Sequence, residues 1–522
     1  LDYLVKQIQE VVEKFQPCGI ILDIVGEHVC YCENCRASVR ELGWDENDSR
    51  SYEKLARIVY KKYYQATNGA ARAIKPDIRL YHNSGHTTRG RYDLMAINTH
   101  QELESLPTGG WGYDHFPLSV RYVCNFPDDY MGITGKFHTG WGEFGGYKHP
   151  NALKYEIAMM LANGAKCSIG DQMHPYGFLD EATYELIGMA YGYAEEVDPY
   201  CYDIQPVADI GVLSIEALTE GRDRKSVHDI GASRMMLEGH YLYDLLDCES
   251  DFGKYKVLIL PDKAGNLSKS MQKKLRTYVD NGGKVLCTGV SGTDEAGKFI
   301  FNMGVGFGCA SAFNPCYYYP SYPAMGLSPT SYVIYGQMYN VSLTDENAVV
   351  LGYCQEPFFN RKTEHFCSHR HAPTKAENCC PAAVIGKEGA YIAYEVFFDY
   401  AQKGSYVLKD MVYRTLDTLL GDQKTVNTNL PSGGKVVLNR QNQYHRDVLH
   451  ALYATPVRRG DGIEVIEDLP AMVDTTFEVV TDPVKKAVLV PQNREVPFAY
   501  ENGVCKLTID KFTCHQIVVL EH

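Results

Sequence analysis

The feature that most constrains the fold is an alternation of short apolar strands and amphipathic helices near the start of the chain. Apolar residues recur at helical spacing over 1–16, and the apolar run GIILDIV (19–25) follows directly. A second helical pattern over 51–74 leads to the strand-like run IRLYHNS (78–84). Alternation of this kind, with apolar strands buried by helices, predicts parallel β/α units.

Three more strands are expected in the same region, and the helices 149–163 and 181–196 separate or follow them. The strands are LMAINTHQELES (94–105), GITGKF (132–137) and AKCSIGD (165–171). A (β/α)8 barrel has eight strands, so roughly three further units are expected to precede residue 1. We therefore predict an α/β fold in which residues 1–202 form a partial TIM-type barrel whose N-terminal units are missing.

Two further regions follow this first one. Residues 203–422 read as a second α/β domain, with strands at ADIGVLS, YKVLILP and KVLCTG, a helix over 233–247 and an irregular stretch at about 309–380. From 423 to 522 strand patterns alternate with turn residues, which predicts an all-β domain, a sandwich.

Polar residues follow almost every strand of the first region. Because the C-terminal ends of parallel strands build the active site of such a fold, these residues are candidates for chemistry. They are Asp23, His82, Asn83, His100, Glu102, Glu104, His138 and Asp171.

The acids among them fit glycoside hydrolysis, which needs one carboxylic acid and one carboxylate. Asp23 ends an apolar strand and is the candidate nucleophile, with a structural or capping role as the alternative. Glu102 and Glu104 alternate with His100, so all three share one face of a strand. One glutamate is the candidate acid/base, and Glu104 is preferred because it is nearer the strand end.

Other side chains are predicted to bind substrate or to compete for the acid role. Glu143, in TGWGEFGGYK, and Asp171 are rival acids. The predicted substrate-binding residues are His82, Asn83, His100, Trp111, His138, Glu143, Asp171 and His174. For any single aromatic ring core packing is the alternative, and no HxxxH spacing supports a catalytic metal, so no catalytic cofactor is expected.

The spacing C-x-C-x-x-C brings Cys30, Cys32 and Cys35 together. Three thiolates in a loop suit structural zinc, although such a site uses four ligands; free packing thiols are the alternative. The chain has 17 scattered cysteines, an odd number that does not suggest a disulfide framework, so a cytoplasmic location is expected.

Charge and hydropathy exclude two classes of partner. The formal net charge of −14 argues against nucleic-acid binding, which relies on Lys and Arg. No apolar run of about 18 residues is present, so no membrane partner is expected.

Two sets of motifs carry a family resemblance. CYCENC after a strand, together with ADIGVLS, VLILPDKAGNLS and YVDNGGKVLCTG, resembles the family-42 β-galactosidases. The resemblance implies zinc at the cysteines and an amidotransferase-like trimerisation domain without amidotransferase chemistry. Those enzymes carry Asn-Glu at the end of the fourth barrel strand, whereas this chain reads Leu-Asp-Ile.

The runs LDIV, THQELESLPTGGWGYDHFP, WGEFGGYK and SIGDQMHPYG are more similar to the α-L-fucosidase-like family 151. This resemblance implies Asp23 as nucleophile and an acid/base on THQELES. We therefore expect a retaining glycoside hydrolase that removes a terminal α-L-fucoside from a glycoside or oligosaccharide, as a homo-oligomer, dimer or trimer. The alternatives are a family-42 β-galactosidase and a non-catalytic sugar-binding or assembly protein, or an inactive fragment.

Overall fold

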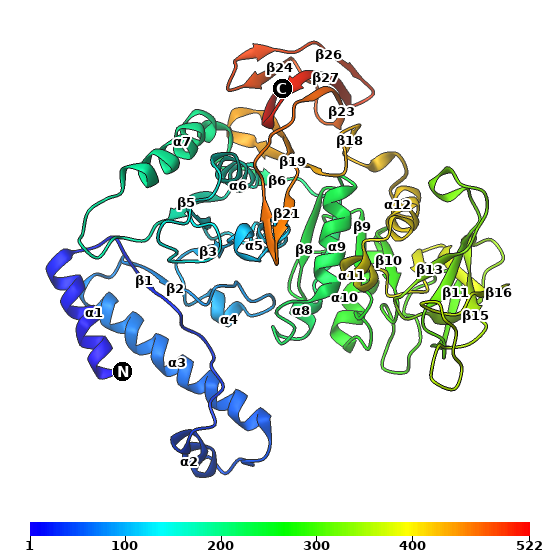
Figure 1. Cartoon of the computed structure of the whole chain (residues 1–522), viewed down its shortest axis with the longest axis horizontal. Helices are drawn as coiled ribbons and strands as arrows, with labels where there is room; N and C mark the ends of the chain where they lie inside the picture. Colours follow the sequence, from blue (N-terminus) through cyan, green and yellow to red (C-terminus); the bar gives the residue numbers. More distant parts are fainter.

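The first region is a curved arc of parallel strands backed by helices. A computed structural model describes all residues, 1–522. Figure 1 shows this arc in blue and cyan, with α7 above its strands and α1 and α3 below them. Its helices and strands in chain order are α1 (Asp2–Phe15), β1 (Gly19–Leu22), α2 (Glu33–Glu41), α3 (Ser49–Ile74), β2 (Arg79–His82), α4 (Tyr92–Met95), β3 (Gln101–Glu104), α5 (His115–Val123), β4 (Tyr130–Gly135), α6 (Pro150–Ala162), β5 (Lys166–Gly170) and α7 (Glu181–Val197).

The five strands of the arc follow one another in chain order. β1 pairs parallel with β2, and β3, β4 and β5 form a second parallel ladder. The amide of Thr99 donates to the Leu80 carbonyl at 2.9 Å, which joins β2 to the segment entering β3. The predicted β/α units are therefore present, but these strands form an open arc and not a closed barrel.

The second region contains a nine-stranded mixed sheet. Its parallel half comprises β17 (Gly389–Ile392), β10 (Lys284–Thr288), β9 (Val257–Leu260), β7 (Ile210–Leu213) and β8 (Tyr243–Leu246). The antiparallel half adds β16 (Thr374–Ile385), β15 (Val349–Pro357), β12 (Cys316–Pro320) and β13 (Tyr332–Ile334), so the stretch predicted as irregular contains several strands joined by long loops. Around the sheet lie α8 (Ile215–Leu218), α9 (Val227–Glu238), α10 (Lys269–Asp280), α11 (Val396–Lys403), α12 (Tyr406–Leu420) and the pair β11 (Val305–Ala310) and β14 (Tyr339–Leu343).

One predicted helix of this region is wrong. Residues 233–247 are not a single helix, because α9 ends at Glu238 and β8 begins at Tyr243. Every residue of β8 is buried, Asp244 included, so the strand shows no period-2 alternation that would separate it from a buried helix.

The C-terminal region is all β, as predicted. Two antiparallel sheets, of six and four strands, share a core that includes Leu449, Phe477 and Val518. The six-stranded sheet holds β25 (Arg494–Glu495), β24 (Lys486–Val490), β28 (Cys514–Glu521), β20 (Arg446–Tyr453), β19 (Gly434–Gln441) and β6 (Gln205–Pro206). The other holds β18 (Val426–Thr428), β23 (Met472–Val480), β27 (Val504–Phe512) and β26 (Phe498–Glu501).

A hairpin leaves this C-terminal region and reaches the other two. β21 (Val457–Gly460) and β22 (Ile463–Val465) pair antiparallel and extend down beside α5, in the angle between the arc and the second region (Figure 1). All three regions thus meet near the loop that follows β3. No helix has the length and apolar composition needed to cross a bilayer.

Candidate active site

Asp23 and Glu104 are brought together by the side chain of Asn83. Asp23 follows β1, Asn83 follows β2, and Glu104 is the last residue of β3. The Asn83 amide nitrogen donates to Asp23 Oδ1 and to Glu104 Oε2, each at 2.9 Å. The Asn83 carbonyl oxygen in turn accepts from the Gly85 amide at 2.7 Å, which fixes the orientation of the side chain.

This bridge limits the distance between the two carboxylates. The two bonded oxygens can be no farther apart than two 2.9 Å bonds laid end to end. Carboxyl groups lie about 5–5.5 Å apart in retaining glycosidases and about 6.5–9.5 Å apart in inverting ones. The arrangement of Asp23 and Glu104 fits the retaining spacing.

Glu102 occupies a different environment from Glu104, although both share one face of β3. Glu102 is 3% exposed, and its carboxylate pairs with His100 Nε2 at 2.8 Å. The buried Tyr81 hydroxyl donates to the Glu102 carbonyl at 2.9 Å, and burial, with the two glutamates, raises the pKa of Tyr81. Glu104 is half-buried, so it is the glutamate that a substrate can reach.

The loop after Asn83 is held by residues of the second region. His86 Nε2 meets the carboxylate of Glu216, on α8, at 2.6 Å, and Arg89 also pairs with Glu216. Glu216 is fully buried. Arg224 donates to the Ser84 carbonyl at 2.8 Å. Residues of the second region therefore help to position the loop that carries Asn83, the side chain that bridges the two carboxylates.

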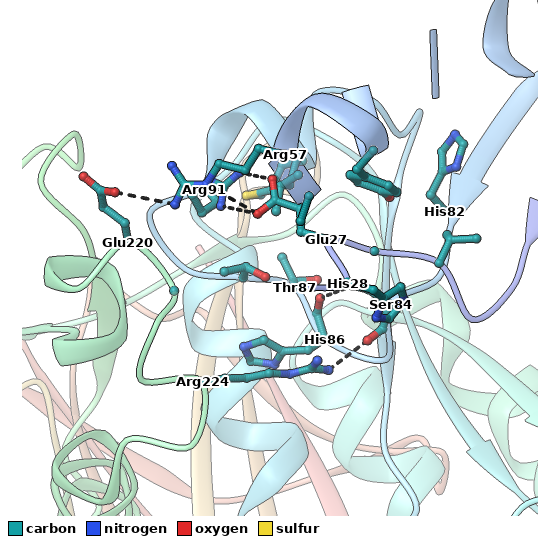
Figure 2. Close-up of a pocket in the computed structure, with 18 of the residues that line it drawn as sticks. Glu27, His28, Arg57, His82, Ser84, His86, Thr87, Arg91, Glu220 and Arg224 are labelled. Carbon is teal, nitrogen blue, oxygen red and sulfur yellow. Dashed lines mark hydrogen bonds and ion pairs between the residues drawn. The ribbon is translucent and has the colours of Figure 1, made fainter. Parts of the chain in front are cut away.

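A polar cavity of about 300 Å³ lies on the α3 side of this loop, and Figure 2 shows it. Neither Asp23 nor Glu104 lines it. Four of its charged side chains form ion pairs with one another: Arg91 pairs with Glu27 at 2.7 Å, and Arg57 pairs with Glu27 and Glu220 at longer range. We read this cavity as a site of structural ion pairs behind the loop.

A solved structure with a similar chain decides the family. The α-L-fucosidase isoenzyme 2 from Paenibacillus thiaminolyticus matches with a TM-score of 0.96 and 44% identity, over 100% of this chain and 80% of that one. The chain belongs to glycoside hydrolase family 151. This family membership confirms the resemblance expected from the LDIV and THQELES motifs.

More distant structures share the fold of this family-151 chain. The family-42 β-galactosidase Gan42B from G. stearothermophilus matches with a TM-score of 0.64 at 13% identity, over 100% of this chain and 81% of that one. The β-galactosidase from Bacillus circulans sp. alkalophilus matches with a TM-score of 0.65 at 14% identity, over 99% of this chain and 82% of that one. Residues 234–306 match the β-galactosidase trimerisation domain. No curated protein sequence matches this chain.

Two residues predicted to bind substrate contact other side chains of this family-151 chain. His82 points toward α3, where its Nε2 meets Asn68 Oδ1 at 2.8 Å, and burial lowers its pKa to about 4. Side chains alternate along a strand, so His82 faces the helix layer while Asn83 faces the carboxylates. His174 stacks on Tyr176 and Phe178 in the loop after β5.

Glu143 is engaged within its own loop. Its carboxylate accepts from the amides of His138 and Thr139 and from the Thr139 hydroxyl, at 2.5–3.0 Å. These hydrogen bonds, that of the Thr139 hydroxyl first, hold the pKa of Glu143 below its usual value. An ionised carboxylate that closes a turn is a poor proton donor, so the geometry does not favour Glu143 as the acid.

The remaining candidates stay at the C-terminal edge of the arc. His138 lies three residues beyond β4 and Asp171 one residue beyond β5, and the ladder register places both strand ends beside that of β3. Trp111, in the loop after β3, packs edge-on against His115 with ring centroids 4.9 Å apart. His100 binds Glu102, as described above.

The three predicted metal ligands are clustered. The sulfur atoms of Cys30, Cys32 and Cys35 all lie within 4.8 Å of one another, and Cys32 and Cys35 Sγ are 3.7 Å apart. Cys32 caps α2, whose first turn contains Cys35. Backbone hydrogen bonding at the helix start lowers the pKa of Cys32, which favours its thiolate. The cluster offers three soft donors that fit a zinc ion.

Sequence reasoning missed the residues that hold the site together. Asn83 was predicted only to bind substrate, whereas it bridges the two carboxylates. Glu216 and Arg224 lie more than 100 residues away in sequence and carry no local motif. Only the packing of the second region against the loop identifies them.

Proposed function

We propose that this protein is a retaining α-L-fucosidase. Asp23 attacks the anomeric carbon and forms a covalent glycosyl-enzyme, while Glu104 protonates the leaving oxygen and then deprotonates water. The observation that carries the proposal is the single Asn83 amide that bonds both carboxylates. The α-L-fucosidase activity named for the Paenibacillus relative supports the choice of sugar.

The stereochemistry of the product tests the mechanism. Early reaction mixtures with 4-nitrophenyl α-L-fucoside should show α-L-fucose first by proton NMR, before mutarotation produces the β anomer. With Asp23→Gly, azide should restore turnover and give β-L-fucosyl azide, because azide fills the space left by the carboxylate. Initial formation of β-L-fucose would show inversion and refute the covalent intermediate.

A β-galactosidase is the competing function, since the fold is shared with family-42 enzymes. Parallel assays on nitrophenyl α-L-fucoside and nitrophenyl β-D-galactoside separate the two. A higher kcat/KM for the galactoside would overturn the assignment of sugar but not that of a glycosidase. Turnover of neither would favour a sugar-binding or assembly role.

The arc is proposed to be part of a (β/α)8 barrel. Both of its outer strands, β1 and β5, have one unpaired edge, and Ile21 on β1 is 59% exposed. Unpaired parallel strands with exposed apolar side chains are uncommon unless further units cover them. The trimerisation-domain match supports a homo-oligomer in addition.

A structural zinc ion is proposed at Cys30, Cys32 and Cys35. Zinc would stabilise the loop after β1 and α2, and it takes no part in hydrolysis. Metal analysis of the purified protein should give one zinc per chain. Cys32→Ser should lower the zinc content while it leaves the carboxylates of Asp23 and Glu104 unchanged. All 17 cysteines are free, which is consistent with the proposed cytoplasmic location.

A further inference from the structure

A second, larger cavity of about 1120 Å³ lies where the three regions meet. Its walls come from the loop after β3, from the segment before α9, and from the C-terminal sheet with its hairpin. Residues representing these walls are Trp111, Tyr113, Arg224, Lys435, Tyr453 and Glu464. Its volume is slightly above that of most ligand sites, which usually enclose about 300–1,000 Å³.

Neither carboxylate lines the cavity itself, but the cavity approaches Glu104 at Gly85. Gly85 lines it, and a Cβ atom at Gly85 would lie 3.9 Å from Glu104 Oε2. The same atom would lie 3.6 Å from the Arg224 guanidinium. The wall formed by residues 110–115 also begins a few residues after Glu104. No residue next to Asp23 in the sequence lines the cavity.

This position determines which part of a substrate the cavity can hold. A general acid must be within hydrogen-bond reach of the oxygen that leaves, so the leaving group lies on the side of the acid. We propose that this cavity binds the leaving-group saccharide of an oligosaccharide, so that the substrate is a fucosylated glycan of at least three sugar units. This inference rests on the proposed function, because it uses Glu104 as the acid.

The chemistry of the walls suits a saccharide. Trp111 and Tyr453 are half-buried rings, which can cover the apolar face of a sugar. Lys435 makes no side-chain hydrogen bond to the protein, and Arg224 makes only the one to the Ser84 carbonyl. Both therefore keep N–H donors for hydroxyl groups.

The hairpin β21–β22 forms part of the enclosure. A Cβ atom at Gly110 would lie 3.7 Å from the Gly462 carbonyl, and one at Gly112 would lie 3.8 Å from Glu464 Oε2. The C-terminal region thus closes over the loop that follows the acid.

Titration calorimetry with lactose, the disaccharide left by hydrolysis of 2′-fucosyllactose, tests the cavity directly. Saturable lactose binding is expected, and Tyr453→Ala should weaken it roughly tenfold through loss of the ring. Tyr453→Phe keeps the ring and should restore binding. The matched control is Tyr184→Ala, because Tyr184 is an exposed tyrosine on α7 outside the cavity.

Kinetics on two substrates give the second readout. Tyr453→Ala should lower kcat/KM for 2′-fucosyllactose roughly tenfold relative to kcat/KM for 4-nitrophenyl α-L-fucoside, whose leaving group is one small ring. An unchanged ratio would overturn the inference. The inference would also be overturned if lactose did not bind, or if Tyr453→Ala left lactose binding unchanged. Loss of lactose binding in Asp23→Ala would overturn it as well, because lactose would then lie at the nucleophile.

The proposed function can fail separately. If the unmodified protein hydrolyses neither fucoside, the enzymatic proposal is wrong, whereas the lactose titration still decides whether the cavity binds a saccharide.

Discussion

The arc and the second region use the same strand–helix alternation, yet the acids at their strand ends differ. Asp262 follows β9 and is fully buried. It accepts from the Thr288 hydroxyl at 2.7 Å and the Phe398 amide at 2.8 Å, and it pairs with His228 at 2.9 Å. Asp23 follows β1, is exposed, and shares one amide donor with Glu104.

The difference teaches that a strand-end acid is not by itself a catalytic residue. An acid whose lone pairs are all satisfied by its own fold stabilises that fold and cannot reach a substrate. An exposed acid with few partners and a second carboxylate nearby contributes little to folding and remains available for chemistry. The thiol in the second region follows the same rule: Cys287 on β10 is buried, and burial raises its pKa to about 12, so it is no nucleophile.

The largest expected effect is at Asp23. Asp23→Ala should reduce hydrolysis of 4-nitrophenyl α-L-fucoside by roughly 10⁴-fold or more, as removal of a covalent catalyst does. Its thermal midpoint should match that of the unmodified protein, because the side chain is exposed. If the variant retained its activity but unfolded at a lower temperature, Asp23 would be a structural residue like Asp262.

The two glutamates of β3 repeat the contrast within a single strand. Glu104→Gln should lower kcat/KM by roughly 10²–10⁴-fold, the usual contribution of a general acid or base. The loss should be greater for an oligosaccharide than for a nitrophenyl glycoside, whose leaving group needs less protonation. Glu102→Gln is the control and should keep most of the activity. If Glu102→Gln lost more activity than Glu104→Gln, Glu102 and not Glu104 would be the acid/base.

In the second region the expected loss is in folding stability. Asp262→Asn should lower the free energy of unfolding by about 3 kcal/mol, because it leaves His228 and buried donors without a charged acceptor. Chemical denaturation measures this loss, and specific activity per folded molecule should stay near that of the unmodified protein. A loss of activity without a loss of stability would mean that the second region takes part in catalysis directly.

The β/α units of the arc, the all-β C-terminal region and the strand-end positions of Asp23 and Glu104 could be predicted from the sequence, because apolar periodicity and strand-end polarity are local signals. It did not predict that His82 faces α3, since neighbouring residues of a strand point to opposite sides and the sequence does not state which side is the site. It also merged α9 and β8. The bridge through Asn83 and its support by Glu216 depend on contacts between distant segments, and no spacing encodes them.

The smallest effect concerns pH, at a place where the arc meets the C-terminal region. Tyr193 on α7 pairs with His515 Nδ1 at 2.6 Å, and His515 Nε2 meets His450 Nδ1 at 3.1 Å. Burial, with Arg121 nearby, lowers the pKa of His450 to about 3; burial also lowers that of His515. Both histidines are therefore neutral in the folded protein well below the ordinary histidine pKa of about 6.5.

Because the pKa is lowered on folding, the stability that these histidines contribute is present above about pH 6.5 and is lost as the pH falls below it. Unfolding free energy should fall by about 1 kcal/mol per histidine between pH 6.5 and 5.5, since only the unfolded chain takes up protons there. His450→Asn keeps a polar group at Nδ1 and should flatten this slope. If the pH dependence of the unfolding free energy were unchanged in this variant, the histidine pair would not link the stability of the two regions. The stability at acidic pH would then depend on the buried, hydrogen-bonded acids of the second region.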